Sequence, residues 1–370
     1  MPHTESKKAP REYPLTPSET DALRDRVQES LHDGVGENGR VLCGILGERA
    51  SIDFSLAAST TRDAPTLAPH APFRIASVTK PYVAAAIFRL WEDGLLDLRQ
   101  PISELIQPQT NAVLMQGGYS TSDICVKHLL AHTGGVYDHC HDPVFEAAIL
   151  HEPERKWTRL EQIAFAAEHG APYGPPESGQ HYSDTGYVIL GEIIEAASGA
   201  MLGGALRSLL KFDRLGLIAT RLEDESYTED AANPVQHARF HDRSTGSFDP
   251  SFDLFGGGGL VSTARDICVF MRALLTGGVF ERSETLAAAL AMPATPHDPS
   301  NNRIRSYLLY RYEWLGAECW GHTGFWGTEA LYCPTLDLAV TLTVFEGGDK
   351  GRAKRLALRE MIERAMKSVL

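Results

Sequence analysis

Segments with the composition of β-strands stand near both ends of this chain of 370 residues, and a helical region separates them. Residues 41–46 and 52–56 are apolar runs on either side of Gly47-Glu48-Arg49, which is typical of two antiparallel strands with a tight connection. Residues 101–259 alternate helical segments with loops rich in proline and glycine. β-branched and aromatic runs recur at residues 307–312, 329–332 and 338–345. The pattern predicts one α/β domain assembled from both ends of the chain, with a helical block inserted.

The predicted fold class is therefore α/β plus all-α, an antiparallel sheet flanked by helices with an inserted helical domain. We expect a flexible leader over residues 1–16. The α/β domain should comprise residues 17–98 and 258–370, and a mostly helical domain with long loops should comprise residues 99–257. Helical spacing predicts helices at both outer ends of the α/β domain.

The chain is acidic, which limits the partners that we expect. Its formal net charge is −13 at pH 7, so attraction to nucleic acid or to an anionic membrane surface is not expected. No apolar run reaches the length of about 18 residues that a membrane span needs. Residues 1–21 lack the apolar segment of a secretory signal. These features predict a cytoplasmic protein with no nucleic-acid or membrane partner.

Six cysteines are scattered along the chain without a Cys-x-x-Cys pair. In a chain without a recognisable signal sequence, this pattern favours buried free thiols over a disulfide framework. It also argues against zinc-ribbon chemistry. The six are Cys43, Cys125, Cys140, Cys268, Cys319 and Cys333.

The segment Phe73-Arg74-Ile75-Ala76-Ser77-Val78-Thr79-Lys80 carries the first candidates for chemistry. Apolar residues recur at helical intervals from Ser77 to Asp93, so Ser77 and Lys80 should share one face at the start of a helix. A serine hydroxyl becomes a nucleophile when a neighbour takes its proton, and a buried lysine with a lowered pKa can do this. Ser-x-x-Lys is common by chance, with a serine cap and a surface lysine as the ordinary alternative, so its meaning depends on what accompanies it.

Two later segments accompany it. Gln180-His181-Tyr182-Ser183-Asp184-Thr185-Gly186-Tyr187 ends a loop rich in proline and glycine and begins a helix, which presents Tyr182 at the loop edge. Trp320-Gly321-His322-Thr323-Gly324-Phe325-Trp326-Gly327 is expected to precede a strand. Its small residues would let a substrate backbone approach, so we expect it to form the far wall of a cleft.

In this order, the three segments resemble the S-x-x-K, S-D-N and K-T-G signatures of serine β-lactamases and penicillin-binding proteins. The chain looks most like the branch that contains class C β-lactamases, the Streptomyces-type D-alanyl-D-alanine carboxypeptidase, D-amino-acid peptidases and amidases, and family VIII-type esterases. That branch has tyrosine in the second motif. Residues 92–98, 129–135 and 258–263 add to the resemblance, which runs from about Pro17 to the C-terminus. It implies a β-lactamase/transpeptidase-like fold and an enzyme without cofactor or metal.

The resemblance also implies a role for each matching residue. Ser77 would be the nucleophile, Lys80 its base or proton-sharing partner, and Tyr182 the group that relays protons to the leaving group and the deacylating water. Either Lys80 or Tyr182 could be the formal base. The backbone N–H groups of Ser77 and Phe325 would form the oxyanion hole. The substrate-binding positions would be Asp184, His322, Thr323, Gly324 and Trp326.

A His-Thr-Gly triplet occurs twice, at His132 and at His322, and only one can be the third motif. We assign the third motif to His322 because it lies C-terminal to the other motifs and close to the predicted strands at 329–345. His132 ends a helix in the middle block, where we expect it to satisfy loop backbone.

Two departures from the β-lactamase pattern bear on the substrate. His322 replaces a lysine, and a neutral histidine offers a substrate carboxylate one donor in place of a fixed charge. Asp184 replaces an asparagine, and a carboxylate can only accept hydrogen bonds. Asp184 would therefore repel an acyl carbonyl and favour an ammonium, as in D-amino-acid esters or amides. The alternative is that Asp184 only caps the helix from Thr185.

Three other features receive no catalytic role. The run Asp138-His139-Cys140-His141-Asp142 is dense in metal-ligand types, but neighbouring residues cannot all face one ion, so we expect a loop near the cleft mouth. Gly256–Gly259 lacks the lysine and hydroxyl residue of a phosphate-binding loop. Aromatic residues at the remaining candidate positions are more often core; they are Tyr137, Trp157, Phe252 and Phe255.

Taken together, the sequence predicts a serine hydrolase that forms an acyl-enzyme on small esters or on D-aminoacyl esters and amides. The first alternative is β-lactamase or D-alanyl-D-alanine carboxypeptidase activity with the same residues, which the missing export signal disfavours. An alternative of another class is a catalytically silent relative that binds a peptide or a protein. The expected partner is a small-molecule ester or amide, and the oligomeric state is left open.

Overall fold

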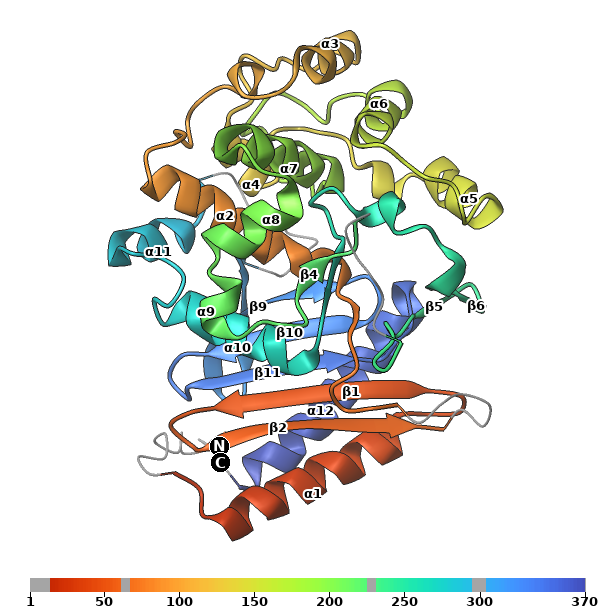
Figure 1. Ribbon diagram of the computed structural model, residues 1–370, viewed down its shortest axis with the longest axis vertical. Coiled ribbons are helices and arrows are strands. Elements are labelled where there is room, and N and C mark those ends of the chain that lie inside the picture. The colour runs from red at the N-terminus through yellow and green to blue at the C-terminus, as the bar shows by residue number, and fades with distance from the viewer. Residues whose placement is uncertain (1–13, 61–66, 225–230, 295–303, 370) are drawn as a thin grey trace, which may run out of the picture.

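A six-stranded antiparallel sheet lies at the centre of the lower part of the molecule, with strand order β2-β1-β11-β10-β9-β8 (Figure 1). The computed structural model describes residues 14–60, 67–224, 231–294 and 304–369. Because β1 pairs with β11, the two ends of the chain meet inside one sheet. The strands are β1 (Arg40–Gly47), β2 (Ile52–Ser59), β8 (Tyr310–Trp314), β9 (Ala317–Gly324), β10 (Thr328–Cys333) and β11 (Leu338–Thr343).

The predicted strands are present, and one further strand was missed. β1 and β2 form the expected antiparallel pair, in register from Arg40 opposite Ser59 to Gly47 opposite Ile52. The segment around His322 precedes strand β10, as expected, but its first part is itself strand β9, which was not predicted. It pairs with β8 on one side and β10 on the other.

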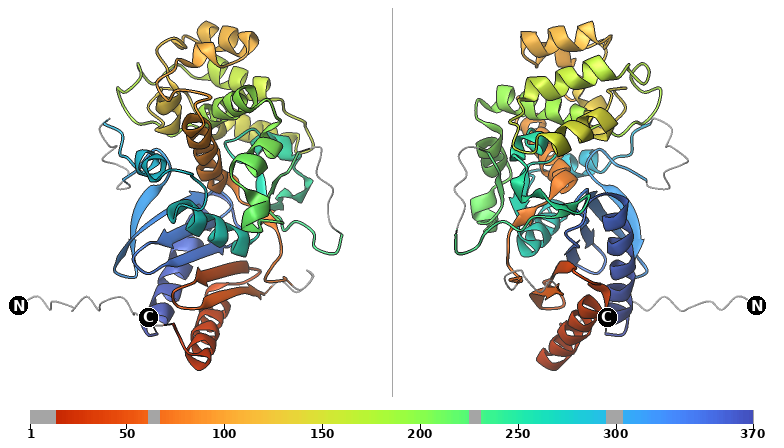
Figure 2. Two further views of the ribbon diagram at one scale, coloured as in Figure 1. Left: turned by 60° about the vertical axis from the view of Figure 1, so that its left-hand side comes forward. Right: turned by 90° about the vertical axis from the view of Figure 1, so that its right-hand side faces the viewer.

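Helices cover both faces of the sheet because successive strand residues point to opposite sides. Val41 and Cys43 of β1 belong to a core shared with α1 (Pro17–Gly34) and α12 (Gly348–Lys367). These two helices lie side by side on one face (Figures 1 and 2). Leu42, between them in sequence, faces the core that contains α10 (Ala264–Leu275).

The helical part packs around α2 (Lys80–Glu92), which contacts α7 and α8. Nearly every residue of α2 is buried, as expected for a helix in the centre of a large core. The predicted middle helices are present. They and their neighbours are α3 (Pro108–Gln116), α4 (Val126–Leu130), α5 (Pro143–His151), α6 (Arg159–His169), α7 (Asp184–Ser198), α8 (Leu202–Leu209), α9 (Phe212–Leu215) and α11 (Ser283–Ala289).

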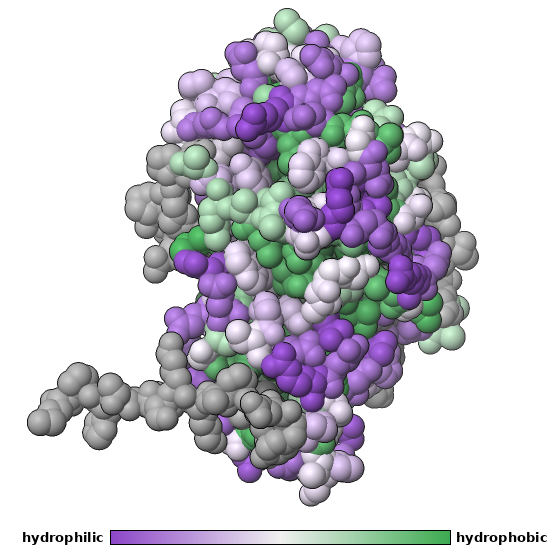
Figure 3. All heavy atoms as spheres, turned by 90° about the vertical axis from the view of Figure 1, so that its left-hand side faces the viewer, coloured by the Kyte–Doolittle hydropathy of each residue, from purple (hydrophilic) through white to green (hydrophobic). Residues whose placement is uncertain are grey.

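Short strands connect the two parts. β3 (Phe73–Arg74), β7 (Leu260–Ser262) and β4 (Arg221–Leu222) form a small sheet in the order β3-β7-β4. β5 (Arg239–Phe240) and β6 (Arg243–Ser244) form a hairpin. One continuous hydrophobic core joins strands of the large sheet to the helical part. On the face shown in Figure 3, hydrophobic residues are visible in the middle of the surface, between more hydrophilic upper and lower regions.

The division into domains stays a prediction. Residues 1–13 of the expected leader lie outside the described residues, whereas Leu15 is buried and Thr16 caps α1 in a capping box with Glu19. In the described ranges no single helix has the length and apolar character to cross a membrane. Only α7 and α8 taken together, bent by 72°, meet that criterion.

The expectation of free cysteines alone is wrong for one pair. Cys319 and Cys333 form a disulfide between β9 and β10. The pairing of Trp320 with Tyr332 places the two cysteines opposite each other, 14 residues apart in sequence. The other four are free thiols; Cys43 and Cys268 are buried, whereas Cys125 and Cys140 are partly exposed.

Packing of α1 against the sheet predicts a large loss of stability on truncation. Leu31 of α1 is fully buried, whereas Leu95 is 56% exposed. Leu31→Ala should lower the free energy of unfolding by about 2–5 kcal/mol because it leaves a cavity. Leu95→Ala, the matched control, should change it by less than about 0.5 kcal/mol. Urea unfolding measures both values, and similar values for the two variants would contradict this packing.

Candidate active site

Ser77 lies in a tight turn between β3 and α2. The turn forms a short 3-10 helix, η1 (Ala76–Thr79), and Ala76 before the serine has a φ of +48°. A residue with a side chain seldom adopts this left-handed conformation, so the surrounding packing must hold it there. The preceding strand is anchored by Arg74, whose guanidinium donates two hydrogen bonds to the Glu223 carboxylate, at 2.7 and 3.1 Å. The turn leaves Ser77 partly exposed while its neighbours are buried.

Lys80 is fully buried directly beside Ser77. Its Nζ donates to Ser77 Oγ at 3.0 Å, to the carbonyl oxygen of Gly257 at 2.6 Å, and to the carboxylate of Asp184. All three donors of the ammonium group are therefore used. The predicted contact between Ser77 and Lys80 is present.

Asp184 has a different partner from the one expected. Its carboxylate forms an ion pair with Lys80, and its backbone N–H donates to Asp138 Oδ1 at 3.1 Å. The helix-cap alternative is also wrong, because Ser183 caps α7 by accepting the N–H of Gly186. A carboxylate already paired with an internal lysine has little charge left to attract a substrate ammonium. The ammonium group that Asp184 binds is that of Lys80.

This ion pair sets the protonation states of the resting site. Burial lowers the pKa of Lys80, but the Asp184 carboxylate, together with Tyr182, more than offsets this and raises the pKa above its usual value. Burial raises the pKa of Tyr182, and Lys80 offsets this only in part. At neutral pH Lys80 is therefore an ammonium and Tyr182 a neutral hydroxyl. The expectation that the pKa of Lys80 is lowered is wrong. The cause is the carboxylate of Asp184, which occupies the position where the resemblance predicts an asparagine.

His132 holds the loop that presents Tyr182. Its Nδ1 accepts the backbone N–H of Ser183 at 3.1 Å, and its carbonyl oxygen accepts that of His181 at 2.8 Å. The ring also lies 4.4 Å from the ring of Tyr182, measured between centroids. These contacts give His132 the predicted part of satisfying loop backbone. Tyr182 itself lies over Lys80, whose Nζ is 4.9 Å from the tyrosine ring centroid.

The third segment ends strand β9 next to the serine turn. A side chain on Gly324 would overlap the carbonyl oxygen of Ile75, so only glycine lets the strand approach the turn this closely. His322 is buried, and its Nδ1 donates to the carbonyl oxygen of Thr323 at 2.8 Å. The Nδ1 atom of His322 is therefore directed at backbone and not into the cavity.

One cavity of about 620 Å³ brings the three segments together. Lys80 contacts Ser77 but does not itself line the cavity. Much of the remaining wall is aromatic, from Phe145, Phe240, Phe248 and Phe252. Tyr137, Trp157 and Phe255 do not line the cavity. The predicted residues that line it are Ser77, Tyr182, Asp184, His322, Thr323, Gly324, Phe325 and Trp326.

Gly257 and Asp253 are among the residues of this site that the sequence did not indicate. The signal for Gly257 was the glycine run 256–259, to which no role at the site was given. Gly257 accepts a hydrogen bond from Lys80, and a side chain on it would come within 3.0 Å of Asp184 Oδ1. Asp253 lines the cavity, and no motif pointed to it. Gly257 and Gly258 let this loop pack tightly against the carboxylates of Asp184 and Asp253.

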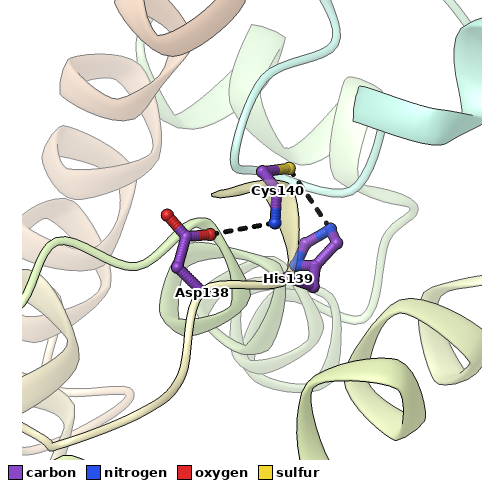
Figure 4. A group of neighbouring side chains, drawn as sticks. All are labelled: Asp138, His139 and Cys140. Carbon is purple, nitrogen blue, oxygen red and sulfur yellow. Dashed lines mark hydrogen bonds between the residues drawn. The ribbon is translucent and has the colours of Figure 1, made fainter. Parts of the chain in front are cut away.

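The run at residues 138–142 supports the site through hydrogen bonds. Asp138, His139 and Cys140 bring one potential ligand atom each within 4.8 Å of the others. Figure 4 shows that the Asp138 carboxylate accepts the backbone N–H of Cys140, while the His139 ring faces the Cys140 thiol at 3.4 Å. His139 Nδ1 also contacts Thr185 Oγ1 at 2.8 Å, on the helix that carries Asp184. The absence of a metal from this site stays a prediction.

The close approach at Gly324 generates a test of the serine's reactivity. Gly324→Ala should push β9 away from η1 and spoil the oxyanion hole, which lowers the rate of fluorophosphonate labelling by about 10²–10³-fold. Gly204→Ala is the control, because an added side chain there has nothing within 4 Å. Labelling of Gly324→Ala at the wild-type rate, with an unchanged melting temperature, would refute this geometry.

The chain is similar to proteins of known family and fold. The sequence model of the Beta-lactamase family matches residues 54–360. The structure of D-amino acid amidase from Ochrobactrum anthropi SV3 complexed with D-phenylalanine is similar, with a TM-score of 0.77 and 24% identity over 94% of this chain and 99% of that one. A D-stereospecific amidohydrolase from Streptomyces sp. has a TM-score of 0.75 and 22% identity over 90% of this chain and 97% of its own.

Sequence relatives match over shorter stretches. Esterase EstB of Burkholderia gladioli is 32% identical over 149 residues, which is 37% of this chain and 35% of the esterase. The curated relatives are matched over 30%, 52% and 35% of their own length. The structural likeness confirms the predicted fold class. Since the family match extends over most of the sequence, the chain belongs to the Beta-lactamase family.

Proposed function

We propose that this protein is a serine hydrolase that forms an acyl-enzyme on small esters or on aminoacyl esters and amides of the D series. One observation carries the proposal: Ser77 opens into a cavity while its hydroxyl accepts a hydrogen bond from a buried lysine. Ser77 as nucleophile, Lys80 as proton carrier and the neutral hydroxyl group of Tyr182 thus lie close together. This is the arrangement that acyl transfer through a serine needs.

The protonation states suggest a route for the proton of Ser77. Lys80 can accept it while passing one of its own protons to Asp184, which leaves an ammonium, a neutral carboxyl and the oxyanion of the tetrahedral intermediate. The oxyanion would lie between the backbone N–H groups of Ser77 and Phe325. The proton then reaches the leaving group through Tyr182, and the acyl-enzyme forms. Water reverses these steps to release the acid. Alternatively, Tyr182 is the formal base.

The cavity wall and the similar proteins favour apolar and amine-bearing acyl groups. Phe240, Phe252 and Trp326 offer an apolar surface beside the nucleophile. The similar amidase was crystallised with D-phenylalanine, and EstB is named an esterase. We therefore place small-molecule esters and D-aminoacyl compounds first among the substrates.

The alternative of a β-lactamase or D-alanyl-D-alanine carboxypeptidase uses the same residues. Against it stands His322, which replaces the lysine of the third motif and whose Nδ1 contacts a backbone carbonyl. A catalytically silent binder would have no need of the Ser77–Lys80–Asp184 arrangement. A cytoplasmic location, and the absence of nucleic-acid and membrane partners, remain part of the proposal.

Removal of the nucleophile tests the proposed chemistry. Wild-type protein should be labelled by a fluorophosphonate and should hydrolyse a nitrophenyl ester and a D-alanine anilide. Ser77→Ala should abolish labelling and lower hydrolysis by at least about 10³-fold. A chromogenic cephalosporin as the preferred substrate would favour the β-lactamase alternative. Failure of the wild type to be labelled would favour the silent binder.

Asp184 should act on all substrates alike, because it acts through Lys80. Asp184→Asn removes the charge that raises the pKa of Lys80 and should lower this pKa. We expect kcat/KM to change by the same factor for an amine-bearing ester and for its amine-free counterpart. A loss confined to the amine-bearing ester would show instead that Asp184 binds the substrate ammonium.

A further inference from the structure

Asp253 is a carboxylate in the cavity that has no partner of its own. It lies at the end of the 3-10 helix η5 (Pro250–Asp253) and lines the same cavity as Ser77. Within residues 14–60, 67–224, 231–294 and 304–369, no hydrogen bond or ion pair reaches its side chain. Asp138 and Asp184, which are buried nearby, each have such a contact, whereas Asp253 is partly exposed.

The cations near Asp253 are already paired with other acids. Lys80 and Arg74 are close enough to influence its charge. Lys80, however, donates to Asp184, and Arg74 donates twice to Glu223. Counted as pairs, these four residues are neutral. Neither of these two cations is therefore paired with Asp253.

The surrounding chain holds this carboxylate in place although its position is unfavourable. A side chain on Gly258 would overlap both carboxylate oxygens, so the glycine provides the space that Asp253 occupies. Burial, with a further contribution from Asp184, raises the pKa of Asp253 to about 7. A carboxylate in such surroundings costs free energy until a cation pairs with it. An ammonium group that enters the cavity would supply a cation for Asp253.

We propose that Asp253 binds the free amino group of an aminoacyl ester or amide, as its ammonium, and so selects amine-bearing substrates. This inference rests on the proposed hydrolase function and gives it a determinant of specificity. Asp184 and Asp253 then divide the work: the first holds the proton carrier Lys80, and the second binds the substrate. The aromatic wall from Phe240 to Trp326 would receive the side chain of the same acyl group.

Two matched substrates test the proposal. D-phenylalanine methyl ester carries the amino group, and methyl 3-phenylpropanoate is the same ester without it. Asp253→Asn should raise KM for the first by about 10–100-fold, with little change in kcat, and leave the second unaffected. Gly258→Ala, which displaces the carboxylate, should reproduce this selectivity. Asp349→Asn is the control, since Asp349 is an exposed carboxylate on the same cavity wall.

The outcomes separate the two proposals. An equal loss on both esters in Asp253→Asn would overturn the role of Asp253 and leave the hydrolase intact. Turnover of neither ester by the wild type would count against the hydrolase. Calorimetry with Ser77→Ala protein then decides the role of Asp253 without turnover. Binding of D-phenylalanine methyl ester that weakens at least tenfold on adding Asp253→Asn supports it, and unchanged or absent binding overturns it.

Discussion

The ammonium group of Lys80 is the point on which the rest of the site depends. A buried cation is stable only where other groups replace its lost hydration. Asp184 supplies the opposite charge, and the Gly257 carbonyl and the Ser77 hydroxyl supply the remaining acceptors. These groups belong to α7, to the glycine run before β7, and to the serine turn. One atom thus ties three distant parts of the chain together and fixes the nucleophile among them.

The large sheet also contacts the serine turn, through strand β9. Through β10 and β11, β9 is joined to β1 and β2 from the start of the chain. Gly324 then allows contact with the backbone of Ile75. Both oxyanion donors would therefore depend on the same strand order that buries α1 and α12 on the far face.

Charge pairing gives chemically identical side chains different tasks. Asp184 and Asp253 line one cavity, but among the residues that the structure describes only Asp184 forms an ion pair. The aspartate in place of the asparagine expected from the resemblance also changes the proton inventory, since it keeps Lys80 protonated at rest. The step from Ser77 to acyl-enzyme then needs a proton to move within an ion pair that is neutral as a whole.

Local patterns were sufficient for most elements, and long-range contacts were beyond them. The β1–β2 pair, α1, α2, α10 and the middle helices follow from apolar periodicity, turn residues and caps. β9 was missed because Gly321 and Gly324 interrupt a segment that reads as a loop. The disulfide was missed because Cys319 and Cys333 become neighbours only when β9 and β10 pair.

The sequence by itself determined the fold class, the family resemblance, and the motif residues that line part of the cavity, which are Ser77, Tyr182, Asp184 and residues 322–326. Motif order and spacing carry that information, because each motif is local. Only the tertiary structure decided what these residues do to one another. Lys80 meets Asp184 across 104 residues of chain and Gly257 across 177. The raised pKa of Lys80, the contact of His322 Nδ1 with backbone and the raised pKa of Asp253 all follow from such contacts and from burial. None of them can be predicted from a single segment.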